Sequence, residues 1–398
     1  MRCKSCNFFI NKKSKTFKNF IITNNYICHE MKKKINLDFF TCSKCGLLQI
    51  KKNFENKYIL PVGNISKQKE PEEHLDKVVN IVSKKTKLNK NCHILGLTYK
   101  DQSLIQRFKS RGYKNSKIFK LDSDNHNFEI MEEILNCKNA KKYSKNQKVK
   151  KFDLIILRHY FEHVFSIKNF FEFVNILIKP NGYLLVEVPD SLKSLKNFDY
   201  LMMWEQHKSY FTPNSLNNVM NVSGFKKNFF YNAKYPYENC MVYLGRKSLR
   251  IKKYSEKNFD KKKIFFEKKI INSYFSKFNK YFYIINRYFK KIKRNNKVIA
   301  IFGAGHQSAS FVHLFKLQKF LNYILDNNKN LKNKFLPGSN LRIMEPKSKL
   351  FKSKIDLCFM IASQLNEKLI KKNNREILNH QGKFLSLSFL SKKKLYKI

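Results

Sequence analysis

The sequence predicts an α/β protein built on doubly wound parallel sheets, with a small metal-binding module at its N-terminus. Three observations predict this class. Two Cys-x-x-Cys pairs stand near the start of the chain, strand and helix patterns alternate between residues 91 and 188, and a second strand leads into a Gly303-Ala304-Gly305 turn. Alternating strands and helices are typical of parallel sheets covered by helices on both faces. We therefore expect two large α/β domains after the metal module.

The N-terminal module, expected over residues 1–60, is defined by Cys3, Cys6, Cys42 and Cys45. Four thiolates in two such pairs are the ligand set of a closed structural Zn²⁺ site. A catalytic zinc ion needs an open coordination position, so we expect this one to be structural. Disulfides or chance pairing are the alternatives. No signal-peptide pattern is evident, which favours a reducing, cytoplasmic location where disulfides are rare.

Composition allows large cores but identifies no partner. The chain has 398 residues, 42% of them hydrophobic, and a net charge of +52 from 81 Lys and Arg against 29 Asp and Glu. Such a charge can indicate a nucleic-acid partner, yet it is spread along the whole chain and no base-reading module accompanies it. We therefore favour a basic solvated surface. No apolar run approaches the roughly 18 residues that span a bilayer, so no membrane partner is expected.

A central domain, expected over residues 74–247, follows a Pro- and Gly-containing linker. Its apolar segments predict strands at 92–97, 117–121, 152–157 and 183–188, and helices at 103–111 and 167–178. In a parallel sheet the ligand lies across the carboxyl ends of the strands. We therefore expect cofactor-binding residues directly after the strands. The candidates are Gly96, Asp101, Asp122 and Arg158, with Asp122 placed to accept hydrogen bonds from ribose hydroxyls.

A long amphipathic helix is expected over residues 260–296, followed by a smaller Rossmann-like domain over 297–398. Apolar residues recur three and four positions apart from Ile271 to Ile292 and form one continuous stripe. A membrane-surface or calmodulin-type helix is possible, but a stripe that leads straight into a strand favours a core-facing connector.

Motifs in order along the chain resemble those of class I S-adenosylmethionine-dependent methyltransferases. More narrowly, the chain resembles a group of sugar C-methyltransferases that joins a zinc module, a methyltransferase domain and a Rossmann-like domain. The motifs are Phe152-Asp153-Leu154-Ile155-Ile156, Phe161-Glu162-His163-Val164, Leu177-Ile178-Lys179-Pro180-Asn181-Gly182, Val186-Glu187-Val188-Pro189, Glu205-Gln206-His207-Lys208-Ser209-Tyr210-Phe211, Gly303-Ala304-Gly305-His306, Asp326-Asn327-Asn328 and Leu336-Pro337-Gly338-Ser339.

The resemblance implies methyl transfer from S-adenosylmethionine to a carbon beside a keto group of a nucleotide-linked sugar. That carbon must lose a proton, which requires a general base and a group that stabilises the enolate. The resemblance assigns His207 as the base and His163 as a second active-site histidine. Glu205 is placed to orient the imidazole, and Tyr210 to donate a hydrogen bond to the enolate oxygen.

Two features depart from the family pattern and keep other functions open. Only Gly96 remains of the glycine-rich turn after the first strand, and Gln206 separates Glu205 from His207. A scaffold that no longer catalyses is therefore one alternative. The turn at Gly303, with Asp326 some twenty residues on, also resembles a dinucleotide fingerprint and would suit an NAD-linked oxidoreductase. A zinc-containing nucleic-acid-binding protein is a third alternative. The turn could instead hold the diphosphate of a sugar nucleotide.

Overall fold

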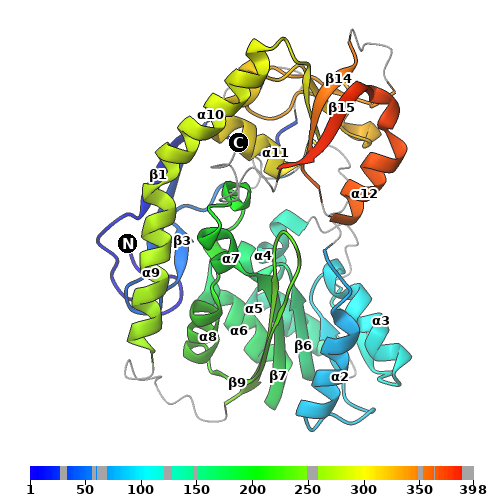
Figure 1. Cartoon of the computed structure of the whole chain (residues 1–398). Coiled ribbons are helices and arrows are strands. Elements are labelled where there is room, and N and C mark those ends of the chain that lie inside the picture. Colours follow the sequence, from blue (N-terminus) through cyan, green and yellow to red (C-terminus); the bar gives the residue numbers. More distant parts are fainter. Residues whose placement is uncertain are drawn as a thin grey trace.

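The structure is a computed structural model that describes residues 1–26, 34–55, 60, 70–120, 128–146, 151–248, 259–347, 353–362 and 364–387. Its strands form three sheets of four, six and five strands. Figure 1 shows the six-stranded sheet below, the five-stranded sheet above, and a long pair of helices that runs along one side of the molecule. The predicted α/β class, with a methyltransferase-like sheet and a second Rossmann-like sheet, is confirmed.

The N-terminal sheet has the order β1-β2-β3-β8 and is antiparallel throughout. Its first three strands are β1 (Lys15–Phe20), β2 (Ile35–Thr41) and β3 (Leu48–Ile50). The fourth, β8 (Ser209–Tyr210), comes from the central part of the chain, and Tyr210 lies opposite Leu48. The segment that contains His207 is therefore fixed against the N-terminal module by backbone hydrogen bonds.

The central sheet has the order β5-β4-β6-β7-β10-β9. Its bounds are β4 (Ile94–Gly96), β5 (Ser116–Ile118), β6 (Phe152–Arg158), β7 (Ile178–Pro189), β9 (Phe225–Ala233) and β10 (Cys240–Lys247). The strands from β5 to β7 are parallel, and β10 is antiparallel to both β7 and β9. The carboxyl ends of β4, β6 and β7 therefore meet at one edge, as the sequence predicts.

Helices cover both faces of this sheet because its central strands are apolar on both sides. Leu154 and Ile156 of β6 pack with α2 (Leu75–Lys85) and α3 (Gln102–Ser110). Ile155 and Leu157 face the opposite way, into a core that includes α5 (Cys137–Asn146), α6 (Ile167–Leu177) and α8 (Pro213–Val222). Figure 1 shows these two groups of helices on either side of the strands. The period-2 alternation of a strand explains this two-sided packing.

The predicted connecting helix is two helices, α9 (Lys261–Ser276) and α10 (Phe278–Arg294), that meet at Lys277. Ile271, Tyr274, Tyr281 and Ile285 of its apolar stripe are buried. They join one core with residues of the N-terminal sheet and of the C-terminal domain, such as Phe39. The stripe therefore faces a core, as expected.

The C-terminal sheet is parallel, with the order β13-β12-β11-β14-β15. Its strands are β11 (Ile299–Phe302), β12 (Tyr323–Leu325), β13 (Ile343–Met344), β14 (Ile355–Met360) and β15 (Leu378–Ser386). Two helices accompany them, α11 (His306–Leu314) and α12 (Gln364–Asn373). The central domain also contains two short helices, α4 (Met131–Ile134) and α7 (Ser191–Lys196).

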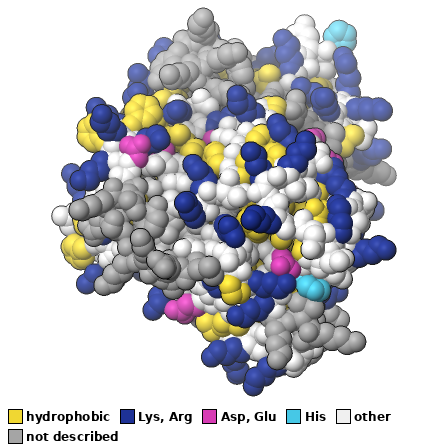
Figure 2. Space-filling model, turned by 90° about the horizontal axis from the view of Figure 1, so that it is seen from below, with side chains coloured by type: hydrophobic (Ala, Val, Ile, Leu, Met, Phe, Trp, Pro, Cys, Tyr) yellow, Lys and Arg dark blue, Asp and Glu magenta, His cyan; other side chains and the backbone are white. Residues whose placement is uncertain are grey.

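Positive charge is spread over the face of the molecule that Figure 2 shows. Figure 2 shows Lys and Arg side chains distributed over the whole visible face, with few acidic groups between them. This distribution agrees with a basic solvated surface on that face. Among the described helices, none is both long enough and apolar enough to cross a bilayer.

Candidate active site

Three histidines from separate segments meet beyond the carboxyl ends of the central strands. His163 ends a short 3₁₀ turn (Phe161–His163) that follows β6, and His207 lies just before β8. Their ring centroids are 4.8 Å apart with the rings edge to face. His306, the first residue of α11, comes from the C-terminal domain and stacks on Trp204 at a centroid distance of 3.8 Å. Trp204 also contacts the rings of both His163 and His207.

Partial or full burial and neighbouring positive groups lower the pKa of each of these imidazoles, which favours their neutral form at physiological pH. His163 is buried, whereas His207 and His306 are partly buried. Burial lowers the pKa of His207 well below its ordinary value, and nearby His306 and Lys100 lower it further. Burial and the neighbouring His207 act in the same direction on the pKa of His163. For His306, burial lowers the pKa to about 3. A neutral imidazole can accept a proton, so His207 has the protonation state that a general base requires.

Glu205 is directed to the N-terminal module. Its Oε1 accepts hydrogen bonds from the backbone N–H and the hydroxyl of Thr23, each at 3.0 Å. The same hydroxyl accepts a hydrogen bond from Trp204 Nε1 at 2.8 Å. Burial raises the pKa of Glu205 to about 7. Glu205 therefore holds the loop before His207 against Thr23, and a role in orienting the imidazole stays a prediction.

Tyr210 is also engaged by the backbone of the loop. Its hydroxyl donates to the carbonyl oxygen of Trp204 at 2.9 Å and accepts from the Trp204 N–H at 3.1 Å. The side chain is 1% exposed. Because both hydrogen bonds fix the Trp204 peptide, the hydroxyl is not directed to a substrate. The predicted role of Tyr210 at an enolate oxygen has no further support from this geometry.

The turn after β4 is closed by its own residues. The carboxylate of Asp101 accepts hydrogen bonds from the N–H groups of Leu97 and Thr98 at 2.8 and 2.7 Å, and from the Arg158 N–H at 2.7 Å. Burial raises the pKa of Asp101 to about 7 despite these bonds. A Cβ on Gly96 would lie 2.7 Å from Ile118 and 2.8 Å from Asp101. Close packing within the chain therefore requires this glycine, and Asp101 ties β4 to β6.

Arg158 belongs to a buried ionic network under the site. Its guanidinium donates two hydrogen bonds to the carboxylate of Glu187, at 2.9 and 3.0 Å. Nε2 of His159 lies 2.9 Å from the same carboxylate, and His74 Nε2 lies 3.2 Å from it. Burial alone would raise the pKa of Glu187, but the charge of Arg158 and the hydrogen bonds from the two histidines hold it well below its usual range. Arg158 is thus a buried support of the strand ends, and the fourth candidate, Asp122, lies outside the described residues.

An ion pair that the sequence did not single out lies at the same edge. Lys100 Nζ is 2.5 Å from Glu70 Oε1, and the Lys100 side chain is 7% exposed while that of Glu70 is 21% exposed. Burial alone would raise the pKa of Glu70, but His159 and Lys100 lower it to about 2. Lys100 stands in the turn after β4, where a glycine was expected, and that position is the signal that could have identified it.

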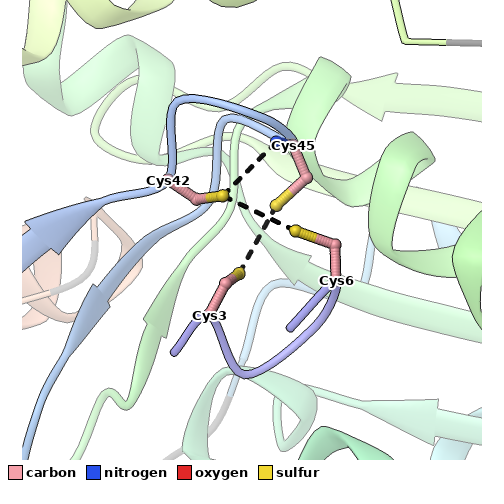
Figure 3. A group of neighbouring side chains, drawn as sticks. All are labelled: Cys3, Cys6, Cys42 and Cys45. Carbon is pink, nitrogen blue, oxygen red and sulfur yellow. Dashed lines mark hydrogen bonds between the residues drawn. The ribbon is translucent and has the colours of Figure 1, made fainter. Parts of the chain in front are cut away.

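The four N-terminal cysteines converge on one point (Figure 3). Sγ of Cys3 lies 3.6 Å from Sγ of Cys45, and Cys6 lies 3.6 Å from Cys42. A disulfide needs about 2.05 Å between sulfurs, so no disulfide is formed. Four sulfurs at about 2.3 Å from a tetrahedral Zn²⁺ ion would lie about 3.8 Å from one another. The cluster therefore fits a structural zinc ion closely.

Neighbouring groups also suit bound thiolates. The Cys45 N–H is directed to Cys42 Sγ at 3.5 Å, and Gln49 Nε2 is directed to Cys3 Sγ at 3.4 Å. Asn218 of α8 donates to the Cys45 carbonyl oxygen at 3.0 Å. Such donors stabilise the negative charge of metal-bound sulfur and fix its orientation. The module is therefore connected to the central domain beside its metal site.

The C-terminal turn at Gly303 is held by groups of this chain. Asp326 accepts hydrogen bonds from the N–H groups of Ala304 and Asn328 at 2.7 and 2.8 Å, and Tyr26 donates to the Ala304 carbonyl oxygen at 2.6 Å. A Cβ on Gly303 would lie 2.4 Å from the Ile361 carbonyl oxygen, and φ there is +102°. Asp326 is the acid that would contact the ribose of NAD, and both of its carboxylate oxygens already accept backbone hydrogen bonds.

Comparison with protein families identifies two parts of the chain. Residues 90–228 match the family described as a methyltransferase domain. Residues 250–387 match the C-methyltransferase C-terminal domain. Two successive parts of the chain thus resemble a methyltransferase domain and a C-methyltransferase C-terminal domain. The histidine pair lies in the first of these domains and His306 in the second. The site thus stands where the two domains meet, and both matches support S-adenosylmethionine-dependent methyl transfer.

Solved methyltransferases resemble the central part of the chain at low identity. A Burkholderia thailandensis 1,6-didemethyltoxoflavin-N1-methyltransferase is 11% identical, with a TM-score of 0.30, over 44% of this chain and 77% of its own. An S-adenosylmethionine-dependent methyltransferase from Archaeoglobus fulgidus is 16% identical, with a TM-score of 0.30, over 44% of this chain and 97% of its own. The search of curated proteins found no match.

A cavity lies between the methyltransferase domain and the C-terminal domain. Its walls include Asp199 and Glu238 from the first domain and Gln307, Ile361 and Glu367 from the second. Burial raises the pKa of Glu238 to about 8, so this carboxyl group carries a proton at neutral pH and can donate a hydrogen bond. Gln307 follows His306 directly, which places the cavity wall beside the histidine cluster.

Proposed function

We propose that this protein transfers a methyl group from S-adenosylmethionine to a carbon atom beside a keto group of a nucleotide-linked sugar. The observation that carries the proposal is the pair His163 and His207, whose rings lie 4.8 Å apart at the edge where the domains meet and whose pKa values are both lowered. The matched C-methyltransferase C-terminal domain favours carbon as the acceptor atom. Carbon, unlike an amine, must lose a proton before it can attack, which explains the need for a base.

In this proposal His207 accepts the proton from the carbon beside the carbonyl group. The resulting negative charge moves to the carbonyl oxygen, where a neutral imidazole N–H of His163 can donate a hydrogen bond. S-adenosylmethionine supplies a methyl group on a positively charged sulfur. Trp204 contacts the rings of both catalytic imidazoles, and His306 stacks on Trp204 from the C-terminal domain. The protein must also position the acceptor carbon in line with the methyl group and the sulfur of S-adenosylmethionine.

We further propose that Lys100 and Glu70 hold the methionine end of the cofactor. That end carries one carboxylate and one ammonium group, and the pair offers one cation and one anion at the carboxyl edge of β4. Lys100 can pair with the carboxylate and Glu70 with the ammonium group, so the two residues fit the cofactor although the turn lacks the usual glycines. Each would exchange its present partner for a cofactor group of the same charge.

The acceptor is proposed to enter the cavity between the two domains. Protonated Glu238 can donate to a sugar hydroxyl, while Asp199 can accept from one. Gly305 precedes α11, and no atom lies within 4 Å of the position that a Cβ would take there. A diphosphate could therefore approach the first N–H groups of α11, a nine-residue helix.

Calorimetry with the zinc-loaded protein at moderate salt, followed by a methyl-transfer assay with keto-sugar nucleotides, tests the proposal. Saturable binding of S-adenosylmethionine and transfer to carbon would support it. Binding of NAD alone would move the chemistry to Gly303 and Asp326. Binding of neither compound would favour a scaffold without activity, and steeply salt-dependent binding of nucleic acid would favour the remaining alternative.

A further inference from the structure

A second group of metal-ligating side chains lies apart from the four cysteines. Ligand atoms of Glu162, His163 and His207 lie within 4.8 Å of one another. Glu162 and His163 are neighbours on the turn after β6, and His207 approaches from the loop that pairs with the N-terminal sheet. The backbone of Glu162 is tied to this loop, because its carbonyl oxygen accepts from the Lys208 N–H at 2.7 Å. The three side chains are therefore brought together by the fold.

One oxygen of Glu162 is buried without a hydrogen-bond partner among the described residues. The residue is 3% exposed, and Oε2 has none of the donors that a buried carboxylate needs. The other oxygen, Oε1, lies 3.9 Å from Nδ1 of His159, beyond hydrogen-bond distance. An unpaired buried carboxylate oxygen is costly, and a cation is one group that can satisfy it. This orphaned oxygen is independent of the histidine geometry and also indicates a ligand.

We propose that Glu162, His163 and His207 form a binding site for a divalent transition-metal ion. Two imidazoles and one carboxylate are the protein ligands of Zn²⁺ in open sites and of non-haem Fe²⁺. Such a site leaves coordination positions for water. The four-thiolate cluster differs from it, since four sulfurs close the coordination sphere.

The surroundings permit the ion. Ligand atoms at about 2.1 Å from a tetrahedral ion lie about 3.4 Å apart, and these ligand atoms already lie within 4.8 Å of one another. The competing positive groups are already paired. His159 Nδ1 lies 3.9 Å from Glu162 Oε1, and its Nε2 is 2.9 Å from the Glu187 carboxylate. Lys100 forms an ion pair with Glu70.

The inference goes beyond the proposed methyl transfer and can fail independently of it. An imidazole nitrogen that coordinates a metal ion cannot accept a proton at the same time. The site therefore either binds the metal ion or has His207 free to act as a base. Measuring the metal content tests only metal binding.

The test counts metal ions on the full-length protein. After removal of loosely bound ions, separate samples of the protein are titrated with Zn²⁺ and with Co²⁺. Bound metal is then measured by elemental mass spectrometry. We expect two equivalents per chain for the wild type. Glu162→Gln and His163→Gln should each bind one equivalent, or bind the second at least tenfold more weakly. His380→Gln alters an exposed histidine of β15 and should still bind two.

Spectra of the Co²⁺ protein distinguish the two sites. The thiolate site gives an intense sulfur-to-metal charge-transfer band, which must persist in Glu162→Gln and His163→Gln and shows that these variants fold. The histidine site adds weaker visible bands, which must be absent from both variants. A wild type that binds a single equivalent would overturn the inference, as would a second equivalent that both variants retain.

Discussion

The ring of His163 meets the ring of His207 edge to face, with centroids 4.8 Å apart. One residue follows a strand of the central sheet, and the other precedes a strand that joins the N-terminal sheet. The contact therefore depends on how the N-terminal module packs on the central domain. Loss of either residue should affect chemistry more than it affects cofactor binding.

The variant His207→Asn tests the general base. Asparagine keeps a polar side chain of similar reach but cannot accept a proton near neutral pH, so methyl transfer should fall by about 10²-fold or more. Binding of S-adenosylmethionine should change little, because the base acts on the acceptor. Single-turnover assays and calorimetry on the same preparation measure the two effects. A variant with wild-type turnover would remove His207 from the mechanism.

The pH dependence of methyl transfer follows from the lowered pKa of His207. An ordinary imidazole, with a pKa of about 6.5, is half protonated near that pH. Burial and His306 keep His207 unprotonated well below it. The acid limb of kcat/KM should therefore lie clearly below pH 6.5, with a plateau through neutral pH. A limb centred near 6.5 would show that the base is solvated or is another group.

The variant Glu205→Gln separates a structural role from a catalytic one. Glutamine can still accept the two hydrogen bonds from Thr23, so the loop before His207 should keep its place. We expect methyl-transfer activity within about tenfold of the wild type, in contrast to His207→Asn. A loss as large as that of His207→Asn would instead confirm that the carboxylate tunes the imidazole.

The same variant changes how stability depends on pH. Burial raises the pKa of Glu205 to about 7 in the folded protein, against about 4.3 in the unfolded chain. The folded state therefore holds the extra proton, and this group destabilises the fold progressively as the pH rises between those values. Glu205→Gln removes the effect, so its unfolding temperature relative to wild type should increase from pH 5 to pH 8. Thermal denaturation at both pH values measures this difference.

The variant Cys42→Ser tests the zinc module. A hydroxyl is a far weaker zinc ligand than a thiolate, so the variant should lose the charge-transfer band of the Co²⁺ protein and unfold at a lower temperature. Cys137→Ser is a matched control, because Cys137 is a partly exposed cysteine outside the cluster. Unchanged metal binding in Cys42→Ser would refute the four-thiolate site.

The sequence predicts individual strands and helices well because the spacing of apolar residues within each segment determines them. The strand from 152 to 157 and the helix from 167 to 178 are observed as β6 (Phe152–Arg158) and α6 (Ile167–Leu177). The four cysteines were equally accessible to prediction, because ligand spacing is a local property.

Contacts between distant segments were not predictable in this way. The hydrogen bonds from Thr23 to Glu205 and from Tyr26 to Ala304 join residues far apart in sequence, and no spacing rule connects them. These contacts decide that Glu205 faces the N-terminal module and that the Gly303 turn is packed against it. The candidate cofactor residue Asp101 likewise has an internal role that only the fold reveals, because its partner Arg158 stands on another strand.

The ion pair Lys100 and Glu70 offers the sharpest test of cofactor binding, because it replaces a glycine turn with charged groups. If the pair holds the methionine end, Lys100→Met should weaken binding of S-adenosylmethionine by at least about tenfold, since one charge-assisted hydrogen bond contributes about 1.5–3 kcal/mol. Lys179→Met is the matched control. It breaks the ion pair between Lys179 Nζ and Asp153 Oδ2, which are 2.9 Å apart at the opposite end of β6. If Lys100 instead blocks the site, Lys100→Met would bind S-adenosylmethionine more tightly. Calorimetry of both variants would show whether the affinity falls or rises.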